Sequence, residues 1–119
     1  GMAFVGPSLM AWKGNKYKAV KTEVDGIVFD SKREAARYME LMLLQKAGEI
    51  SHLELQPEYQ CIIDGKKICT YRGDFRYFND RNSVVEDVKS PYTAKNPVYR
   101  LKKKLVEALY PGVIIQEVY

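Results

Sequence analysis

The chain has 119 residues, of which 46% are hydrophobic, and its 19 Lys and Arg against 15 Asp and Glu give a net charge of +4. This length allows one domain with one hydrophobic core and excludes a second domain. The apolar N-terminal stretch is interrupted by Gly6 and Pro7 and lacks a basic start, so it predicts neither a membrane span nor a signal peptide. We therefore expect a cytosolic protein without membrane association.

The basic residues are concentrated near the two ends of the chain, at Lys13, Lys16, Lys18 and Lys21, and at Lys102, Lys103 and Lys104. Clustered positive charge indicates a polyanion partner, most simply nucleic acid. A solvated, solubilising surface explains the charge equally well, so both interpretations stay open. Two cysteines and one histidine without a CxxC pair do not predict a structural zinc site.

Gly1 before Met2 indicates a residue added for expression, and we assign 1–16 to an N-terminal extension and 17–119 to the single domain. The first predicted element is a β-hairpin, residues 18–24 and 27–29, around the Asp25-Gly26 turn. A helix follows, with Ser31 and Glu34 as a capping box and Gly48 as the stop. Its apolar residues at helical spacing are Ala35, Tyr38, Met39, Met42 and Leu43.

Residues 52–89 predict three consecutive strands with turns at 64–65 and 80–83. Asn96 and Pro97 open a second helix that runs to about Leu109, and residues 113–118 form a last strand. In this helix we expect a buried stripe, with Lys103 pointing most directly to water; the stripe is Val98, Leu101, Leu105 and Leu109. The order predicts a mixed α/β sheet with a helix on each face.

Two carboxylates and an ammonium interrupt the most apolar strands of the chain. Asp87 and Lys89 are two residues apart and share one face of a strand, while Glu86 and Val88 point the other way. If the strands pair around the 80–83 turn, Asp74 converges with Asp87 at one end of the sheet. Two close carboxylates repel unless a cation intervenes, and oxygen ligands suit Mg²⁺. Lys89 would then orient the attacking water or neutralise a charged transition state.

Each of these residues also has an ordinary structural interpretation. A D-x-K triplet is common by chance, and Asp87 with Lys89 could form a salt bridge on a wet face. Asp74 could cap a turn beside Gly73, and Glu34 could simply close its capping box. For each residue taken alone, the structural interpretation is favoured over the catalytic one.

Four segments taken together carry a resemblance, namely "FDSKREAARYMEL", "LQPEY", "YRGDFRYF" and "VVEDVKS". In this order they resemble the PD-(D/E)xK nuclease superfamily, and more closely a family of small phage and prophage proteins assigned to it. The layout is also similar to phage Holliday-junction-resolving endonucleases and to the end-cleaving nuclease subunit of some transposition systems. The resemblance covers the chain from about Tyr17 onward. It implies a restriction-endonuclease-like αβββαβ core.

By position, the resemblance implies that Asp74 and Asp87 are metal ligands, that Lys89 is the catalytic lysine, and that Glu34 completes the metal site. Gln56 corresponds to a recurrent glutamine on the first core strand. Gly73 stands where the motif has proline, and the adjacent Glu86 leaves open which acid is the ligand, although the shared face with Lys89 favours Asp87. The implied cofactor is Mg²⁺, with Mn²⁺ as a substitute.

The resulting hypothesis is a metal-dependent deoxyribonuclease of phage or prophage origin, acting in the bacterial cytoplasm on branched or recombination and repair intermediates. The residues expected near the DNA backbone are Tyr92, Lys95, Tyr99, Arg100, Lys102, Lys103 and Lys104. Cutting two strands at once favours a homodimer. The alternatives are a non-catalytic DNA-binding accessory protein that retains the fold, and an α/β interaction module that binds neither metal nor DNA.

Overall fold

The computed structural model describes residues 20–119, so the predicted N-terminal extension and three of the N-terminal lysines lie outside the described residues. The chain divides into two units, residues 1–36 and 37–119, and each is described by itself. In the first unit, β2 (Thr22–Val24) pairs antiparallel with β3 (Ile27–Phe29). Asp25 and Gly26 turn the chain with φ of 53° and 77°, which confirms the predicted hairpin.

The boundary between the units falls within helix α1 (Lys32–Lys46). The helix begins as predicted, because Ser31 Oγ accepts a hydrogen bond of 3.1 Å from the backbone N–H of Glu34. Its buried residues are Ala35, Tyr38 and Leu41, whereas three of the residues predicted on its apolar stripe, Met39, Met42 and Leu43, are exposed. The predicted helix is therefore confirmed, but its predicted buried face is confirmed only at Ala35 and Tyr38.

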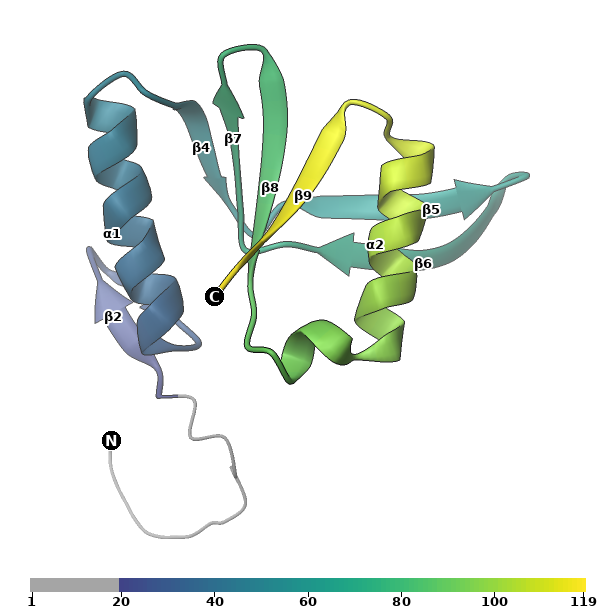
Figure 1. Cartoon of the computed structure of the whole chain (residues 1–119), viewed down its shortest axis with the longest axis horizontal. Coiled ribbons are helices and arrows are strands. Elements are labelled where there is room, and N and C mark those ends of the chain that lie inside the picture. The colour runs from purple at the N-terminus through teal and green to yellow at the C-terminus, as the bar shows by residue number, and fades with distance from the viewer. Residues whose placement is uncertain (1–19) are drawn as a thin grey trace, which may run out of the picture. The chain divides into compact units, whose positions relative to one another are not determined.

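The second unit contains a mixed sheet of four strands in the order β4-β7-β8-β9 (Figure 1). Strands β4 (Ser51–Leu55), β7 (Phe75–Asn79) and β8 (Asn82–Val88) are antiparallel, and β9 (Val113–Val118) is parallel to β8. The connection from β8 to β9 contains the short 3-10 helix η1 (Thr93–Lys95) and helix α2 (Pro97–Leu109). A mixed sheet, two helices and an N-terminal hairpin are therefore present as predicted.

The predicted first and second core strands are each broken in the middle. Strands β5 (Glu58–Ile63) and β6 (Lys66–Arg72) form a separate antiparallel pair beyond β4 and β7. Backbone hydrogen bonds continue across the break, from Gln56 N–H to Asp74 O at 2.9 Å and from Gly73 N–H to Pro57 O at 3.0 Å. Residues 51–79 thus form one long hairpin with a bend at 56–57 and 73–74, in place of two straight strands.

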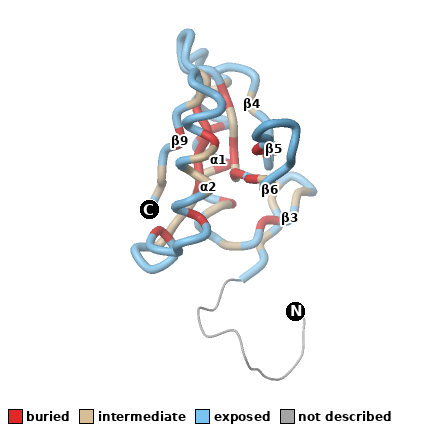
Figure 2. The backbone as a smooth tube through the Cα atoms, turned by 90° about the vertical axis from the view of Figure 1, so that its right-hand side faces the viewer, coloured by how far each residue is buried: buried red, intermediate tan, exposed pale blue. Residues whose placement is uncertain are grey.

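Consecutive residues of β8 point to opposite faces of the sheet. Glu86 is hydrogen-bonded to Arg37 of α1, while Val85 packs in one core cluster with Tyr99 and Val106 of α2. Figure 2 shows buried stretches on α2, β5 and β6, which belong to that same cluster. The part of α1 from Arg37 onward and helix α2 therefore contact opposite faces of the sheet, as the sequence predicted.

Helix α2 starts as predicted, with Asn96 Oδ1 accepting from the Tyr99 N–H at 3.0 Å. Of the predicted buried stripe, Leu105 packs partly buried against the core cluster, whereas the prediction is wrong for the other three residues. Tyr99 and Val106 are buried, whereas Val98 and Leu101 are each 60% exposed. The helix packs on β5, β6 and β9. An aromatic ring covers more apolar surface there than valine, and neighbouring lysines can bury their stems if their ammonium groups find acceptors.

Candidate active site

Asp87 is the central residue of the site, and it is 6% exposed at the end of β8. Its Oδ2 accepts a hydrogen bond of 2.5 Å from the hydroxyl of Tyr71 on β6. Burial, and then the charge and hydrogen bond of Asp87, raise the pKa of Tyr71 far above its ordinary value. The phenol therefore remains a donor throughout the physiological range and fixes the orientation of the carboxylate.

Lys89 lies beside Asp87, with its Nζ 3.4 Å from Asp87 Oδ1. The same ammonium sits 3.9 Å from the centre of the Tyr99 ring, within the range of a cation–π contact. The predicted shared face of Asp87 and Lys89 is confirmed. A buried carboxylate, a phenol, an ammonium and an aromatic face thus converge from β6, β8 and α2.

These residues line a cleft of about 780 Å³ that also contains several other basic and aromatic side chains. Four basic and two acidic side chains line it, so its charge is net positive; they are Arg72, Lys89, Lys95 and Lys102, and Glu58 and Asp87. A cleft of this volume accepts a ligand larger than a metal ion with its waters. The positive lining favours an anionic ligand.

Asp74 occupies the bend between β6 and β7, and not the middle of a strand as the sequence suggested. Its Oδ2 accepts a hydrogen bond of 2.7 Å from the backbone N–H of Val88, the residue bonded to Asp87. Its own N–H donates to Glu86 O at 2.9 Å. The charge of Asp74 also contributes, after that of Asp87, to the raised pKa of Tyr71. Asp74 therefore lies against the backbone of the Asp87 segment.

Gly73 makes this bend possible, because a side chain there would collide with β8. A Cβ built on Gly73 would lie 2.6 Å from Val85 Cγ1, closer than real Cβ atoms approach. Opposite Asp74, Gln56 has a φ of 51°, which is uncommon for a residue other than glycine. Gln56, predicted on a core strand, is exposed and lies in the gap between β4 and β5.

Glu86 is fully buried and its carboxylate is engaged by protein groups. Arg37 donates to it from Nε at 2.8 Å and from Nη2 at 2.7 Å, and the Tyr77 hydroxyl donates to Oε2. Hydrogen bonding to Glu86 holds the pKa of Arg37 above its ordinary value. This bidentate geometry is that of a structural ion pair. Of the two adjacent acids, Asp87 is therefore the one that lines the cleft.

Glu34 belongs to the first unit, residues 1–36, while Asp74, Asp87 and Lys89 belong to the second. Its role as a third metal ligand stays a prediction. A group of three or more His, Cys, Asp or Glu side chains able to hold a metal ion is absent from residues 20–119.

A family model described as "Protein of unknown function (DUF1064)" matches residues 14–118, which is nearly the whole chain. The chain belongs to the DUF1064 family. No curated protein and no solved structure matches the chain. None of the helices in residues 20–119 is long and apolar enough to cross a membrane.

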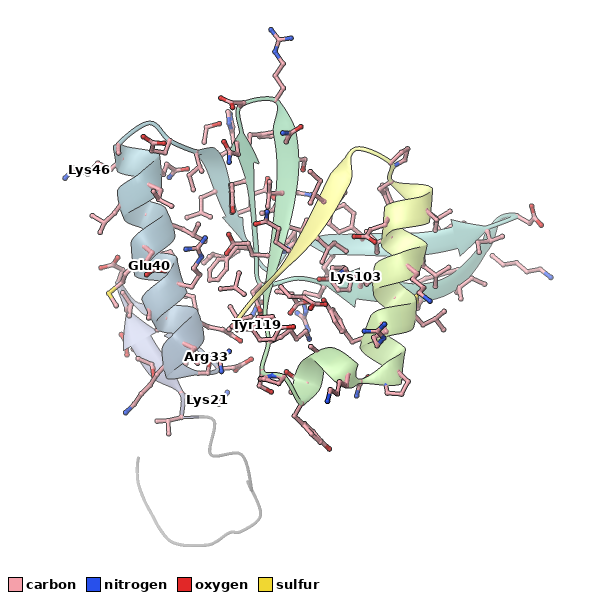
Figure 3. The ribbon with its side chains drawn as sticks, viewed as in Figure 1. Lys21, Arg33, Glu40, Lys46, Lys103 and Tyr119 are labelled. Carbon is pink, nitrogen blue, oxygen red and sulfur yellow. The ribbon has the colours of Figure 1, made fainter. Side chains whose placement is uncertain are left out.

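In this DUF1064 chain, the lysines of α2 are placed differently from the prediction. Lys102 Nζ donates to Thr70 O at 3.0 Å and Lys103 Nζ contacts Glu117 Oε2 at 3.3 Å, so Lys103 reaches toward β9 and not toward water (Figure 3). Lys95, Arg100 and Lys104 are exposed. Of the described N-terminal lysines, Lys21 forms an exposed ion pair with Asp30.

Three residues of the site were missed by sequence reasoning, namely Tyr71, Arg37 and Glu117. Glu117 is the parallel partner of Asp87 in the register between β8 and β9, and it accepts hydrogen bonds from the Tyr99 and Tyr119 hydroxyls, each at 2.8 Å. Strand alternation could have placed Tyr71 on a core face. Arg37 lies one helical turn after Glu34. Nothing in that local spacing indicates that the partner of Arg37 is Glu86, 49 residues away in the sequence.

Carboxylate oxygens such as those of Asp74 and Asp87 are the ligand type of a hard divalent cation, which often uses only one or two carboxylates and keeps several waters. The ammonium of Lys89 at 3.4 Å from Asp87 Oδ1 demonstrates that positive charge is accommodated beside this carboxylate. That these two aspartates hold Mg²⁺ or Mn²⁺ stays a prediction; Asp87 lines the cleft and Asp74 does not.

Proposed function

We propose that this DUF1064 chain is a metal-dependent deoxyribonuclease with a restriction-endonuclease-like core, as its resemblance to phage and prophage members of the PD-(D/E)xK superfamily implies. The observation that carries the proposal is the ion pair between buried Asp87 and half-buried Lys89 in the lining of a net-positive cleft. Buried ionisable pairs in clefts are frequent at catalytic centres, although structural ion pairs share this property.

Asp74 and Asp87 would hold the divalent cation, with Glu34 as a further ligand by resemblance. When bound, such a cation makes a water molecule easier to deprotonate and stabilises negative charge on a phosphate. Lys89 would donate to the phosphate oxygens, where an ammonium neutralises developing charge. Tyr71 keeps Asp87 oriented through its 2.5 Å hydrogen bond, and the Tyr99 ring contacts the Lys89 ammonium at 3.9 Å.

The non-catalytic accessory role is the second candidate, and one observation favours it. Both carboxylate oxygens of Asp87 already contact protein groups, Tyr71 and Lys89, as they would in a purely structural ion pair. Calorimetry with Mg²⁺ and Mn²⁺ separates the two roles, because only a nuclease needs a cation at this site.

The decisive experiment is a cleavage panel of linear duplex, single-stranded, flap and four-way-junction DNA with either cation. Lys89→Ala should lower the cleavage rate at least about 10²-fold, as loss of a group that stabilises transition-state charge does. Asp87→Asn should lose both cleavage and cation binding. Glu107→Gln, an exposed change on α2, is the control and should cut at the wild-type rate. Cleavage by Lys89→Ala at the wild-type rate would remove the lysine from the mechanism.

A further inference from the structure

The cleft next to Asp87 and Lys89 has an exposed aromatic residue at its edge. Tyr92 lines the cleft and is 66% exposed, although it follows Lys89 by only three residues. Val98, which also lines the cleft, is 60% exposed. Exposed apolar surface beside a polar site commonly marks a place where another molecule binds.

Tyr92 lies in a turn that is closed by hydrogen bonds. Ser90 and Thr93 bond reciprocally, from Ser90 N–H to Thr93 Oγ1 at 2.8 Å and from Thr93 N–H to Ser90 Oγ at 3.0 Å. The N–H of Ala94 donates to Ser90 O at 2.9 Å, and Ala94 is buried. Because the backbone on both sides is fixed, a ligand that contacts Tyr92 would not first have to order this turn.

Positive charge lies in the lining of the same cleft as this aromatic residue. Lys95 lies on η1 and lines the cleft. Arg72 lies on β6 and also lines the cleft, and its Nη1 is 3.9 Å from Glu58 Oε2 in an exposed ion pair. A cleft with both an exposed ring and a net-positive lining matches a polymer that has flat apolar faces and a charged backbone. Single-stranded nucleic acid combines these two properties, since its bases are uncovered and its phosphates are anionic.

In an intact duplex the faces of the bases are covered by their neighbours in the stack, so they cannot stack on an exposed tyrosine. We infer that the cleft binds single-stranded DNA, with one unpaired base stacked on Tyr92 and the adjoining phosphates contacted by Lys95 and Arg72. The choice of DNA rests on the proposed nuclease function, whereas the single-stranded character rests on Tyr92 itself. The substrate class would thus be an unpaired strand, as in a flap or a frayed end.

The test is fluorescence anisotropy in EDTA, where no cleavage can occur, with a single-stranded DNA of about 12 nucleotides, within the site sizes of single-strand binding proteins. Tyr92→Ala should weaken binding about 5- to 100-fold, the range seen when a stacking aromatic is removed, and Tyr92→Phe should restore it. A closed dumbbell duplex of the same sequence should bind the protein more weakly than the single strand does. Its affinity should be the same for the wild type and for both variants.

Tyr119→Ala is the matched control, because Tyr119 is similarly exposed at 63% and lies outside the cleft lining, at the C-terminal end (Figure 3). Unchanged affinity of Tyr92→Ala for the single strand, or an equal loss for the dumbbell, would overturn the inference. Equal or tighter binding of single-stranded RNA of the same sequence would overturn the choice of DNA. The readout is independent of cleavage, so failure of the nuclease proposal leaves this result interpretable, and the reverse holds too.

Discussion

Glu86 and Asp87 are adjacent acids on one strand, and their surroundings differ completely. Glu86 points to the face of the sheet contacted by α1 and is enclosed by Arg37 and Tyr77. Asp87 points to the face of the sheet that α2 covers, and together with Lys89 it lines a cleft there. Both carboxylates contact protein groups through both of their oxygens, and the difference is that Asp87 lines a cleft whereas Glu86 does not. The comparison shows that burial alone does not separate an acid that lines a cleft from one that the protein encloses.

The matched pair Glu86→Gln and Asp87→Asn tests this comparison most strongly. Glu86→Gln should lower the free energy of unfolding by about 3–5 kcal/mol, because it leaves the Arg37 charge without its bidentate partner. Asp87→Asn should cost less than about 2 kcal/mol, because Tyr71 can still donate to the amide oxygen and Lys89 is near solvent. Urea denaturation of both variants measures the difference. Equal losses would mean that both acids are structural.

The substitution Gly73→Ala tests whether the bend at 73–74, which brings Asp74 and Tyr71 close to Asp87, requires glycine. A methyl group would have to displace Val85 Cγ1, which lies 2.6 Å from the built Cβ position. We expect a loss of about 1–3 kcal/mol in the free energy of unfolding, the usual cost of overpacking. The companion change Gly112→Ala has open space around its Cβ and serves as the control. Thermal melts of the two variants should therefore separate, and coincident melts would show that the bend can relax.

Glu117→Gln gives the smallest effect and concerns the acid of β9 that is the register partner of Asp87. Hydrogen bonds from Tyr99, then Tyr119, and then Lys103 hold the pKa of Glu117 below its ordinary value. The stabilisation is therefore complete above the unfolded pKa of about 4.3 and is lost as the pH falls through the lower folded value. At pH 7 the variant should be less stable by about 1 kcal/mol. The gap should close in acid, and a gap independent of pH would contradict this assignment.

Local patterns in the sequence determined the elements of the fold well. The Asp25-Gly26 turn, the Ser31 cap and the Asn96-Pro97 start lie where the sequence placed them. The strand period also placed Asp87 and Lys89 on one face and Glu86 on the other. These features depend on interactions within a few residues, and turn geometry, capping and strand alternation are all local.

Only the tertiary structure decided which faces are buried and which residues surround Asp87. The apolar stripe of α2 was misassigned because Tyr99, Lys102 and Lys103 find their acceptors on strands far away in the sequence. The contacts of Tyr71 with Asp87 and of Arg37 with Glu86 span 16 and 49 residues. Such pairings follow from sheet register and helix packing, and no periodicity in one segment can specify a partner in another.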